Sequence, residues 1–193
     1  MRLSRFATSC SILIAFAASV FAAVPAADAA ASCGYVPTPV FAPWGDTNPY
    51  APFQGSSFES GASGWSWTNK ASIISGDNGL ITPGTHAVEI PGTGAAKSPW
   101  TCVDSTTPSL RFVVRRVSGS GKLTVNGIVS GAGGQATTMI AFAGSSVWQP
   151  SPIVTFPQGF VTTGTAQAQF TFTSDANTVY RIDDVYIDPI KCC

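Results

Sequence analysis

Charged side chains are scarce in this chain: Asp, Glu, Lys and Arg together make up 10% of its 193 residues. Long solvent-facing helices carry many such side chains, so their scarcity disfavours a helical protein. Ten basic residues balance ten acidic ones, which leaves no excess positive charge to attract nucleic acid or anionic lipid. We therefore expect no nucleic-acid partner and no binding to an anionic membrane surface.

Residues of catalytic type are also few. His86 is the only histidine, and no serine near it lies in a nucleophile motif such as G-x-S-x-G. A single histidine before the apolar Val88 and Ile90 is typical of a structural role, although the sequence leaves a Ser-His-Asp triad open. The glycine-rich run at 131–134 lacks the lysine of a phosphate-binding loop. These absences predict that the chain is not an enzyme.

The acidic cluster near the C-terminus does not change this expectation. Asp183 and Asp184 are neighbours in an expected strand, so they would face opposite sides of a sheet. Asp184 and Asp188 would share a face but lie about 13 Å apart, beyond the ~6.5–9.5 Å of an inverting glycosidase pair. We expect no glycosidase carboxylate pair here.

A membrane-spanning segment is missing as well. The apolar stretch from Ile12 to Val24 is shorter than the ~18 residues that a transmembrane helix needs. Arg2 and Arg5 precede it, and small residues at 27–29 follow it as a cleavage site, so residues 1–29 are interpreted as a secretory signal peptide. This predicts a secreted, extracellular protein. Acylation of Cys33 in a lipoprotein is the alternative, and Ala30 disfavours it because a larger aliphatic residue is expected there.

Cysteine is limited to five residues, of which Cys10 lies in the expected signal peptide. The even number that is left, Cys33, Cys102, Cys192 and Cys193, suggests disulfides in an exported protein. Three pairings are open, but Cys192 and Cys193 could join each other only through a strained ring. We favour a bond between Cys33 and Cys102. The spacing resembles no zinc site.

The chain is instead rich in glycine, proline, serine, threonine and aromatic residues, a composition that favours short strands joined by turns. Removal of the signal peptide would leave 164 residues with eight basic and nine acidic side chains, a size that suits one domain. Isolated aromatics and prolines at 30–54 predict an extended N-terminal arm laid over the domain. Residues 55–193 are then expected to form a β-sandwich domain.

Strand patterning is clearest at 166–173, where Ala168, Phe170 and Phe172 alternate with polar residues. Similar strand-forming runs occur at 56–60, 65–75, 86–90, 110–117, 122–130, 136–143 and 179–187. No stretch has a convincing helical period. Some eight or more strands without interleaved helices predict an all-β sandwich or barrel.

Motifs at both ends of the expected domain carry a family resemblance. Ser57-Phe58-Glu59-Ser60-Gly61 is followed by Gly64-Trp65, and the chain closes on Tyr180-Arg181-Ile182-Asp183-Asp184-Val185-Tyr186-Ile187-Asp188-Pro189. These segments resemble jelly-roll carbohydrate-binding modules of the galactose-binding-like superfamily. The resemblance implies an antiparallel jelly-roll β-sandwich.

A second resemblance extends over nearly the whole chain after residue 30. It is to a group of uncharacterised exported actinobacterial proteins, and it rests on the early cysteine, the closing strand and four further motifs. These motifs are Trp44-Gly45-Asp46, Cys102-Val103, Leu110-Arg111-Phe112 and Trp148-Gln149-Pro150-Ser151. This group implies no activity for the chain.

The resemblance to carbohydrate-binding modules also implies a structural calcium ion, with Glu59 and Asp183 among its ligands. Two carboxylates and nearby backbone carbonyls could supply the six to eight oxygens that calcium prefers. Alternation places Asp183 on one face with Val185 and Ile187, where an unpaired charge would be costly. The alternative is that the two carboxylates pair with arginine, at Arg111, Arg115 or Arg181.

Aromatic side chains are the candidates for ligand contact, because flat rings stack on sugars. We select Trp148, Trp67 and Trp100 as the ligand-binding residues, with Trp148 first because serines and a proline flank it. Trp65 and Trp67 share one face of a strand, so at least one of them should fill the core. Tyr186 is a further aromatic candidate, and hydrogen bonds are expected from Asn126, Gln167 and Gln169.

These features predict a secreted, non-catalytic, carbohydrate-binding-like module, with a glycan or cell-wall polysaccharide as its partner. The alternative is a cell-surface or matrix structural protein without a small-molecule ligand. A hydrolase would require His86 to lie in a cleft beside a serine and a carboxylate. The sequence predicts no oligomeric state.

Overall fold

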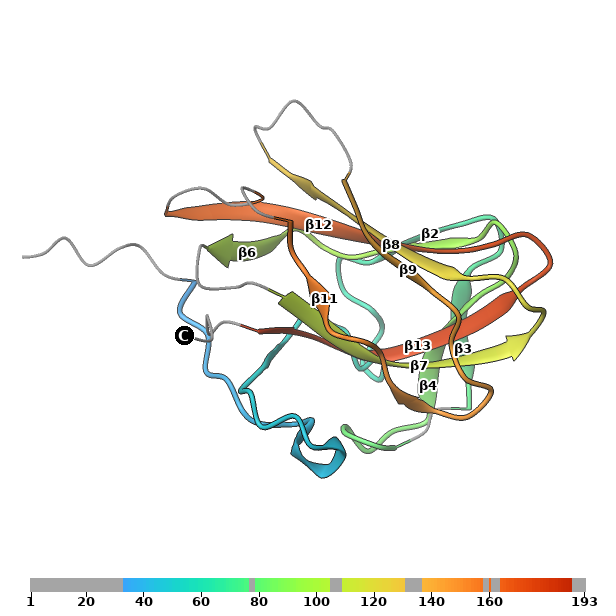
Figure 1. Cartoon of the computed structure of the whole chain (residues 1–193), viewed down its shortest axis with the longest axis horizontal. Coiled ribbons are helices and arrows are strands. Elements are labelled where there is room, and N and C mark those ends of the chain that lie inside the picture. Colours follow the sequence, from blue (N-terminus) through green and yellow to red (C-terminus); the bar gives the residue numbers. More distant parts are fainter. Residues whose placement is uncertain are drawn as a thin grey trace, which may run out of the picture.

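The computed structural model describes residues 33–76, 79–104, 109–130, 137–157, 160 and 164–188, and within them the chain forms two stacked antiparallel sheets (Figure 1). The seven-stranded sheet runs β10 (Gln149–Pro150), β7 (Ser109–Ser118), β13 (Val179–Asp188), β4 (His86–Ile90) and β3 (Ser72–Ser75), with β1 (Ala51–Pro52) on β13 and β11 (Val154–Thr155) on β7. The six-stranded sheet runs β2 (Ser66–Thr68), β5 (Ala95–Lys97), β12 (Thr165–Ser174), β8 (Leu123–Val129) and β9 (Thr137–Phe142), with β6 (Thr101–Asp104) on β12. The predicted all-β antiparallel sandwich is confirmed.

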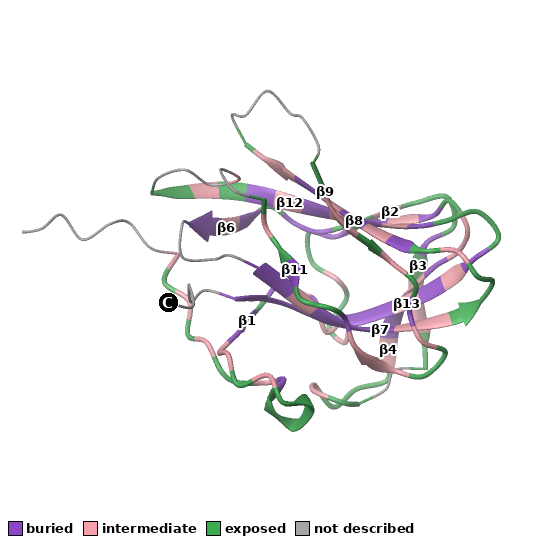
Figure 2. Ribbon diagram, in the orientation of Figure 1, coloured by how far each residue is buried: buried purple, intermediate pink, exposed green. Residues whose placement is uncertain are grey.

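The core lies between the two sheets. Ala168, Phe170 and Phe172 of β12 are fully buried, which confirms the alternation read from the sequence. Across the gap, the inward residues of β7 and β13 are buried in the same cluster, and Figure 2 shows β13 buried over most of its length and the end of β7 exposed. Trp65 is buried in this cluster and Trp67 packs against it, as their shared face predicts.

Four connections change sheets at one end of the sandwich. They join β2 to β3, β4 to β5, β7 to β8 and β12 to β13, and they gather at the right of Figure 1. The expected strand at 65–75 is therefore wrong as one element: Asn69 and Lys70 take positive φ angles and turn the chain from one sheet into the other. Periodicity cannot show such a break, because both halves are strand-like.

The expected strand at 56–60 is also wrong, because this segment is a series of turns. Gly55 has φ +65°, and a β-carbon there would lie 2.8 Å from the Ser63 backbone nitrogen. Phe58 has φ 59° and is still buried in the core. Ser56 donates its hydroxyl to the Val185 carbonyl at 2.8 Å, which ties the turn to β13. Local strand propensity is thus overridden by this tertiary tie.

A β-bulge at Asp184 interrupts the closing strand. Asp183 pairs with Val113 but Tyr186 pairs with Arg111, so β13 has one residue more than β7 in this interval, and Asp184 has φ 50°. Val185 and Ile187 consequently join the inner core. The expectation that Asp183 shares their face is wrong: Asp183 shares the face of Val113, on the outside of the seven-stranded sheet.

The N-terminal arm, drawn in blue in Figure 1, packs on that outer face. Four buried residues, Phe41, Tyr50, Val113 and Tyr186, form an outer cluster there, and Phe41 meets Tyr50 and Tyr186 edge-on. Within 33–50 the regular structure is a single bridge, from Thr38 to Tyr50, and the 3-10 helix η1 (Ala42–Trp44). The proposed boundary between arm and domain at residue 54 stays a prediction.

An ion pair and a disulfide anchor the arm. Asp46 pairs with Arg111 of β7, so two of the resemblance motifs meet in space. The Arg111 guanidinium also lies 4.9 Å from the Phe41 ring centroid. Nearer the N-terminus, Cys33 is bonded to Cys102, as predicted. Cys192, Cys193 and the expected signal peptide lie outside the described residues.

Burial raises the pKa of Tyr50, and its hydroxyl's hydrogen bond to Asp46, 2.7 Å long, raises it further. The Asp46 carboxylate therefore binds both the Arg111 guanidinium and the Tyr50 hydroxyl.

None of the described residues forms a helix long and apolar enough to span a membrane.

Replacing both Cys33 and Cys102 by serine should lower the free energy of unfolding by about 2–4 kcal/mol, because the bond closes a loop over a sequence separation of 69 residues. Urea denaturation of the double variant against the oxidised parent measures the change. An unchanged midpoint would show that the arm adds no stability through this bond.

Arg111→Met should cost about 3 kcal/mol, because it leaves the Asp46 carboxylate buried without its cation; the exposed fractions of the Arg111 and Asp46 side chains are 13% and 9%. The double variant Arg111→Met, Asp46→Asn should recover part of this loss, because no charge is then left buried. Equal destabilisation in the single and double variants would contradict this account. Chemical denaturation of all three variants provides the measurement.

Candidate functional site

An exposed tryptophan marks the pocket best suited to a ligand. Trp100 is 47% exposed and lies where the arm meets β6, on the rim of a cavity of about 300 Å³. The lining residues of this Trp100 pocket are Tyr35, Pro52, Phe53, Gln54, Trp100, Thr101 and Cys102. The volume is at the lower end of the range for small-ligand sites.

The register of β12 explains why Trp100 points away from the core. Lys97 of β5 pairs with Thr171, whereas Thr101 of β6 pairs with Ala168, so the chain from β5 to β6 holds one residue more than β12 does. The Ser98 hydroxyl accepts the Phe170 N–H at 3.0 Å, and the Ser98 N–H donates to the Phe170 carbonyl at 2.8 Å. These bonds pin the irregularity to β12.

The arm supplies the opposite wall of the pocket. The Tyr35 hydroxyl donates to the Cys102 carbonyl, beside the disulfide to Cys33. Burial, and then the nearby negative charge of Asp104, raise the pKa of Tyr35 to about 12, so its hydroxyl stays protonated at neutral pH. Trp65 donates its indole N–H to the Gln54 carbonyl at 3.0 Å and so fixes the backbone of this wall.

The lining residues of the Trp100 pocket define its chemistry. None of the seven side chains is charged, and they combine an indole face with the Gln54 amide, whereas the buried Thr101 hydroxyl donates to the Pro99 carbonyl at 3.3 Å. An indole face favours the C–H face of a sugar ring, and an amide group can bond its hydroxyls. The pocket therefore suits a neutral polyhydroxylated ligand better than a charged one.

The three tryptophans selected from the sequence do not share a site. Trp67 is partly buried and stacks on Trp65, with ring centroids 6.2 Å apart. Trp148 lies just before β10 and packs against the outer cluster, and the Arg115 guanidinium lies 5.6 Å from its ring centroid. Of these three, only Trp100 lines one of the described pockets.

The expected hydrogen-bonding residues lie along the outer face of the six-stranded sheet. Gln167 is exposed and pairs with Cys102, which lines the Trp100 pocket. Gln169 donates to the Ser98 carbonyl at 2.9 Å, and Asn126 accepts from the Thr138 hydroxyl at 2.7 Å. Gln167 is therefore the one of the three best placed beside Trp100.

His86 and Glu59 form a contact that sequence reasoning did not pair. Glu59 Oε1 accepts the backbone N–H groups of Thr85 at 2.9 Å and His86 at 2.6 Å, while Oε2 lies 3.1 Å from His86 Nδ1. Burial raises the pKa of Glu59, but the hydrogen bonds from His86 and Thr85 outweigh it and lower the pKa below its usual value.

The same contact bears on the hydrolase alternative. The Thr85 hydroxyl lies 3.1 Å from His86 Nδ1, the nitrogen that also faces Glu59. A catalytic triad needs its hydroxyl and its carboxylate on opposite ring nitrogens. His86 is half-exposed and lines neither described pocket, so this arrangement is not that of a triad.

The remaining alternative for the carboxylates was a pairing with arginine. Arg111 pairs with Asp46, Arg181 pairs with Glu89 at 2.8 Å, and Glu59 pairs with His86 instead. The alternative of an arginine partner is therefore wrong for Glu59.

The predicted calcium ligands differ in how well they fit a cation. Asp183 is buried and offers carboxylate oxygens, of which Oδ1 accepts the Asp184 N–H at 2.8 Å. Glu59 does not fit as placed, because N–H donors and an imidazole surround its oxygens. Across the described ranges, no three His, Cys, Asp or Glu side chains gather as a metal cluster. Calcium at these residues stays a prediction.

Sequence reasoning missed the arm's contribution to the pocket. Tyr35 and Gln54 were placed in the arm but were given no role. The disulfide was the available signal, because a bond from Cys33 to Cys102 brings Tyr35 close to Trp100, two residues before Cys102. The exposure of Trp100 itself depends on the register irregularity at Ser98, which no periodicity reveals.

No family model and no curated protein sequence matches the chain. Among solved structures it is similar to the CBM22-1 xylan-binding domain of Xyn10C from Paenibacillus barcinonensis, with 14% identity and a TM-score of 0.52 over 72% of this chain and 94% of that domain. The CBM22-1–CBM22-2 tandem of the same protein gives 15% identity and a TM-score of 0.52 over 71% and 45%. These similarities show that the chain has the jelly-roll sandwich fold of carbohydrate-binding modules.

Proposed function

We propose that this chain is an exported, non-catalytic module that binds a neutral glycan at the Trp100 pocket. One observation carries the proposal: an indole that is 47% exposed stands on the rim of a pocket whose lining side chains are uncharged. Large apolar side chains are usually buried, and an exposed one on a concave site is typical of ligand contact.

The pocket's construction supports binding without a large rearrangement. The disulfide, the Tyr35 hydrogen bond and the Gln54 tie to Trp65 hold both walls before any ligand arrives. A preformed wall reduces the entropy lost on binding. The volume of about 300 Å³ suits one sugar ring or a chain end rather than a long polymer segment.

The fold similarity suggests the first ligands to try. The similar structure from Paenibacillus barcinonensis is described as a xylan-binding domain, so neutral xylo-oligosaccharides should lead the panel. Gluco- and galacto-oligosaccharides complete it. A chain that bound none of them would favour the alternative, a cell-surface or matrix structural protein.

Trp100→Ala should weaken glycan binding by about tenfold or more, because the stacking surface is lost. Trp44→Ala is the matched control: Trp44 is 37% exposed, lies on η1 and does not line the pocket. Isothermal titration with each oligosaccharide measures both variants. Equal loss in the two variants, or full binding by Trp100→Ala, would refute the Trp100 pocket as the site.

Calcium is proposed as a structural ion with Asp183 as a ligand. A 100-fold excess over the dissociation constant should raise the melting temperature by about 5–10 °C, and a chelator should reverse the rise. Asp183→Asn should abolish the shift, whereas Glu59→Gln should keep most of it, because protein donors already hold Glu59. A melting temperature that changes with neither calcium nor chelator would refute the proposed calcium ion.

A further inference from the structure

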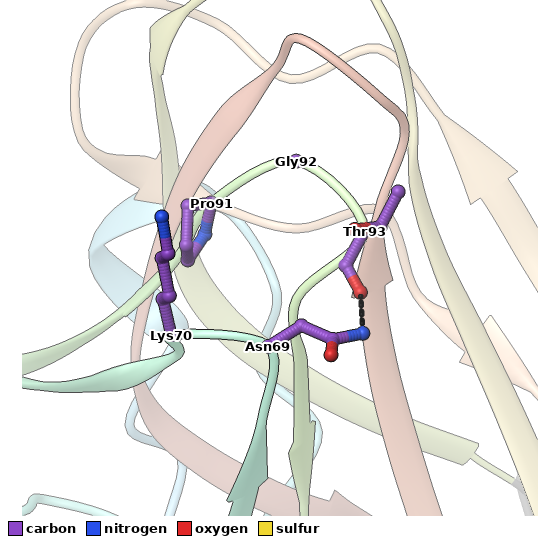
Figure 3. Close-up of a pocket in the computed structure, with 5 residues that line it drawn as sticks. All are labelled: Asn69, Lys70, Pro91, Gly92 and Thr93. Carbon is purple, nitrogen blue, oxygen red and sulfur yellow. Dashed lines mark hydrogen bonds between the residues drawn. The ribbon is translucent and has the colours of Figure 1, made fainter.

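A second pocket lies at the end of the sandwich where the four connections change sheets. Its volume is about 410 Å³, and Asn69, Lys70, Pro91, Gly92 and Thr93 line it. Figure 3 shows Lys70 standing beside the Pro91 ring on one side and the Asn69–Thr93 hydrogen bond on the other. The pocket is therefore built from two connections, β2 to β3 and β4 to β5.

Three lining residues have backbone angles that cost free energy. Asn69, Lys70 and Thr93 have φ angles of 49°, 70° and 63°. Asparagine tolerates this left-handed region, but lysine does so less well, and a β-branched threonine there is a genuine outlier. Glycine would adopt both positions without the steric cost. Strained residues of this kind concentrate at functional sites, where the surrounding structure holds them in place.

The surrounding hydrogen bonds hold this strain in place. Asn69 donates its side-chain amide to the Thr93 carbonyl at 3.0 Å, and the Thr93 N–H donates to the Ser174 carbonyl at 3.1 Å. Gly92 packs so closely on the β12–β13 turn that a β-carbon there would lie 2.6 Å from the Asn177 nitrogen. These contacts tie the two connections to each other and to the β12–β13 turn.

The pocket carries one charge. Lys70 is exposed and takes no part in the three ion pairs formed within the described ranges. The amide nitrogen of Asn69 is used by Thr93, which leaves its carbonyl oxygen as an acceptor. The Thr93 hydroxyl and the Pro91 ring add a donor and an apolar surface. We propose that this pocket binds the carboxylate-bearing ring of a uronic acid, with Lys70 on the carboxylate.

This second site is separate from the Trp100 pocket, and only the choice of a sugar acid among carboxylates rests on the proposed glycan function. Thr93, which lines the second pocket, donates its N–H to the Ser174 carbonyl of β12. Thr101, which lines the Trp100 pocket, pairs with Ala168, six residues earlier on the same strand. At about 3.3 Å per residue, the two pockets lie about 20 Å apart along this strand. One small ligand cannot occupy both, so each can be tested alone.

The test uses tri-galacturonate as the probe, in a Trp100→Ala background that isolates the second pocket. Isothermal titration should detect tri-galacturonate but not the neutral galactotriose. Lys70→Met removes only the charge and should weaken tri-galacturonate binding about tenfold without changing the melting temperature. Lys122→Met is the matched control, since Lys122 is an exposed lysine on another connection at the same end.

Lys70→Gly separates a binding role from a structural one. It should weaken tri-galacturonate binding at least as much as Lys70→Met does and raise the melting temperature by about 2–4 °C, because glycine relieves the backbone strain. Failure of the Trp100→Ala protein to bind tri-galacturonate would overturn the proposal, as would unchanged binding in either Lys70 variant. Equal loss in Lys122→Met would overturn it too, because binding would then depend on general charge.

Discussion

The burial of Phe170 and Phe172 of β12 in the core between the two sheets is the interaction on which the other features depend. Phe170 contacts Phe53, which directly follows β1, with 5.5 Å between the ring centroids. Phe172 meets Phe112 of β7 edge-on, with 5.1 Å between the ring centroids. A one-residue slip of β12 would turn both rings to solvent, so the core determines its register. That register in turn sets where β5 and β6 pair with β12, and this pairing exposes Trp100. It also places the Ser174 carbonyl where it accepts the Thr93 N–H.

The N-terminal arm is held on the sandwich by two interactions of different physical kinds, a disulfide and an ion pair. The Cys33–Cys102 bond acts mainly by restricting the unfolded chain. The Asp46–Arg111 pair is nearly buried, where desolvation offsets most of the Coulomb attraction, so its net contribution is small although its disruption is expensive. Such a pair specifies one docking position more than it adds stability. The outer cluster around Phe41 supplies the apolar burial that holds the arm down.

Sequence patterns predicted the features that depend on local alternation and failed where an irregularity intervened. The burial of Ala168, Phe170 and Phe172, and the long strands β7, β8 and β13, follow from period-two patterning. The short strands β5 and β6 were missed because their small residues and the nearby prolines give no clear strand pattern. The bulge at Asp184 places Asp183 on the face opposite to the one that simple alternation assigns. The extra residue near Ser98 turns Trp100 outward, so that Trp100 and not Trp148 lies at the proposed site. Both irregularities arise from pairing with distant strands, which no local pattern contains.

The two proposed pockets differ in how the fold sustains them. The Trp100 pocket costs little backbone strain among its lining residues, and a crosslink maintains it. The second pocket places lysine and threonine at positive φ angles, which glycine adopts without the steric cost. A polysaccharide that carried neutral and acidic sugars would be able to engage both pockets, since they lie about 20 Å apart along β12. The second contact would then be intramolecular, so a polymer that reached both pockets would bind more tightly than a short oligosaccharide that reaches one.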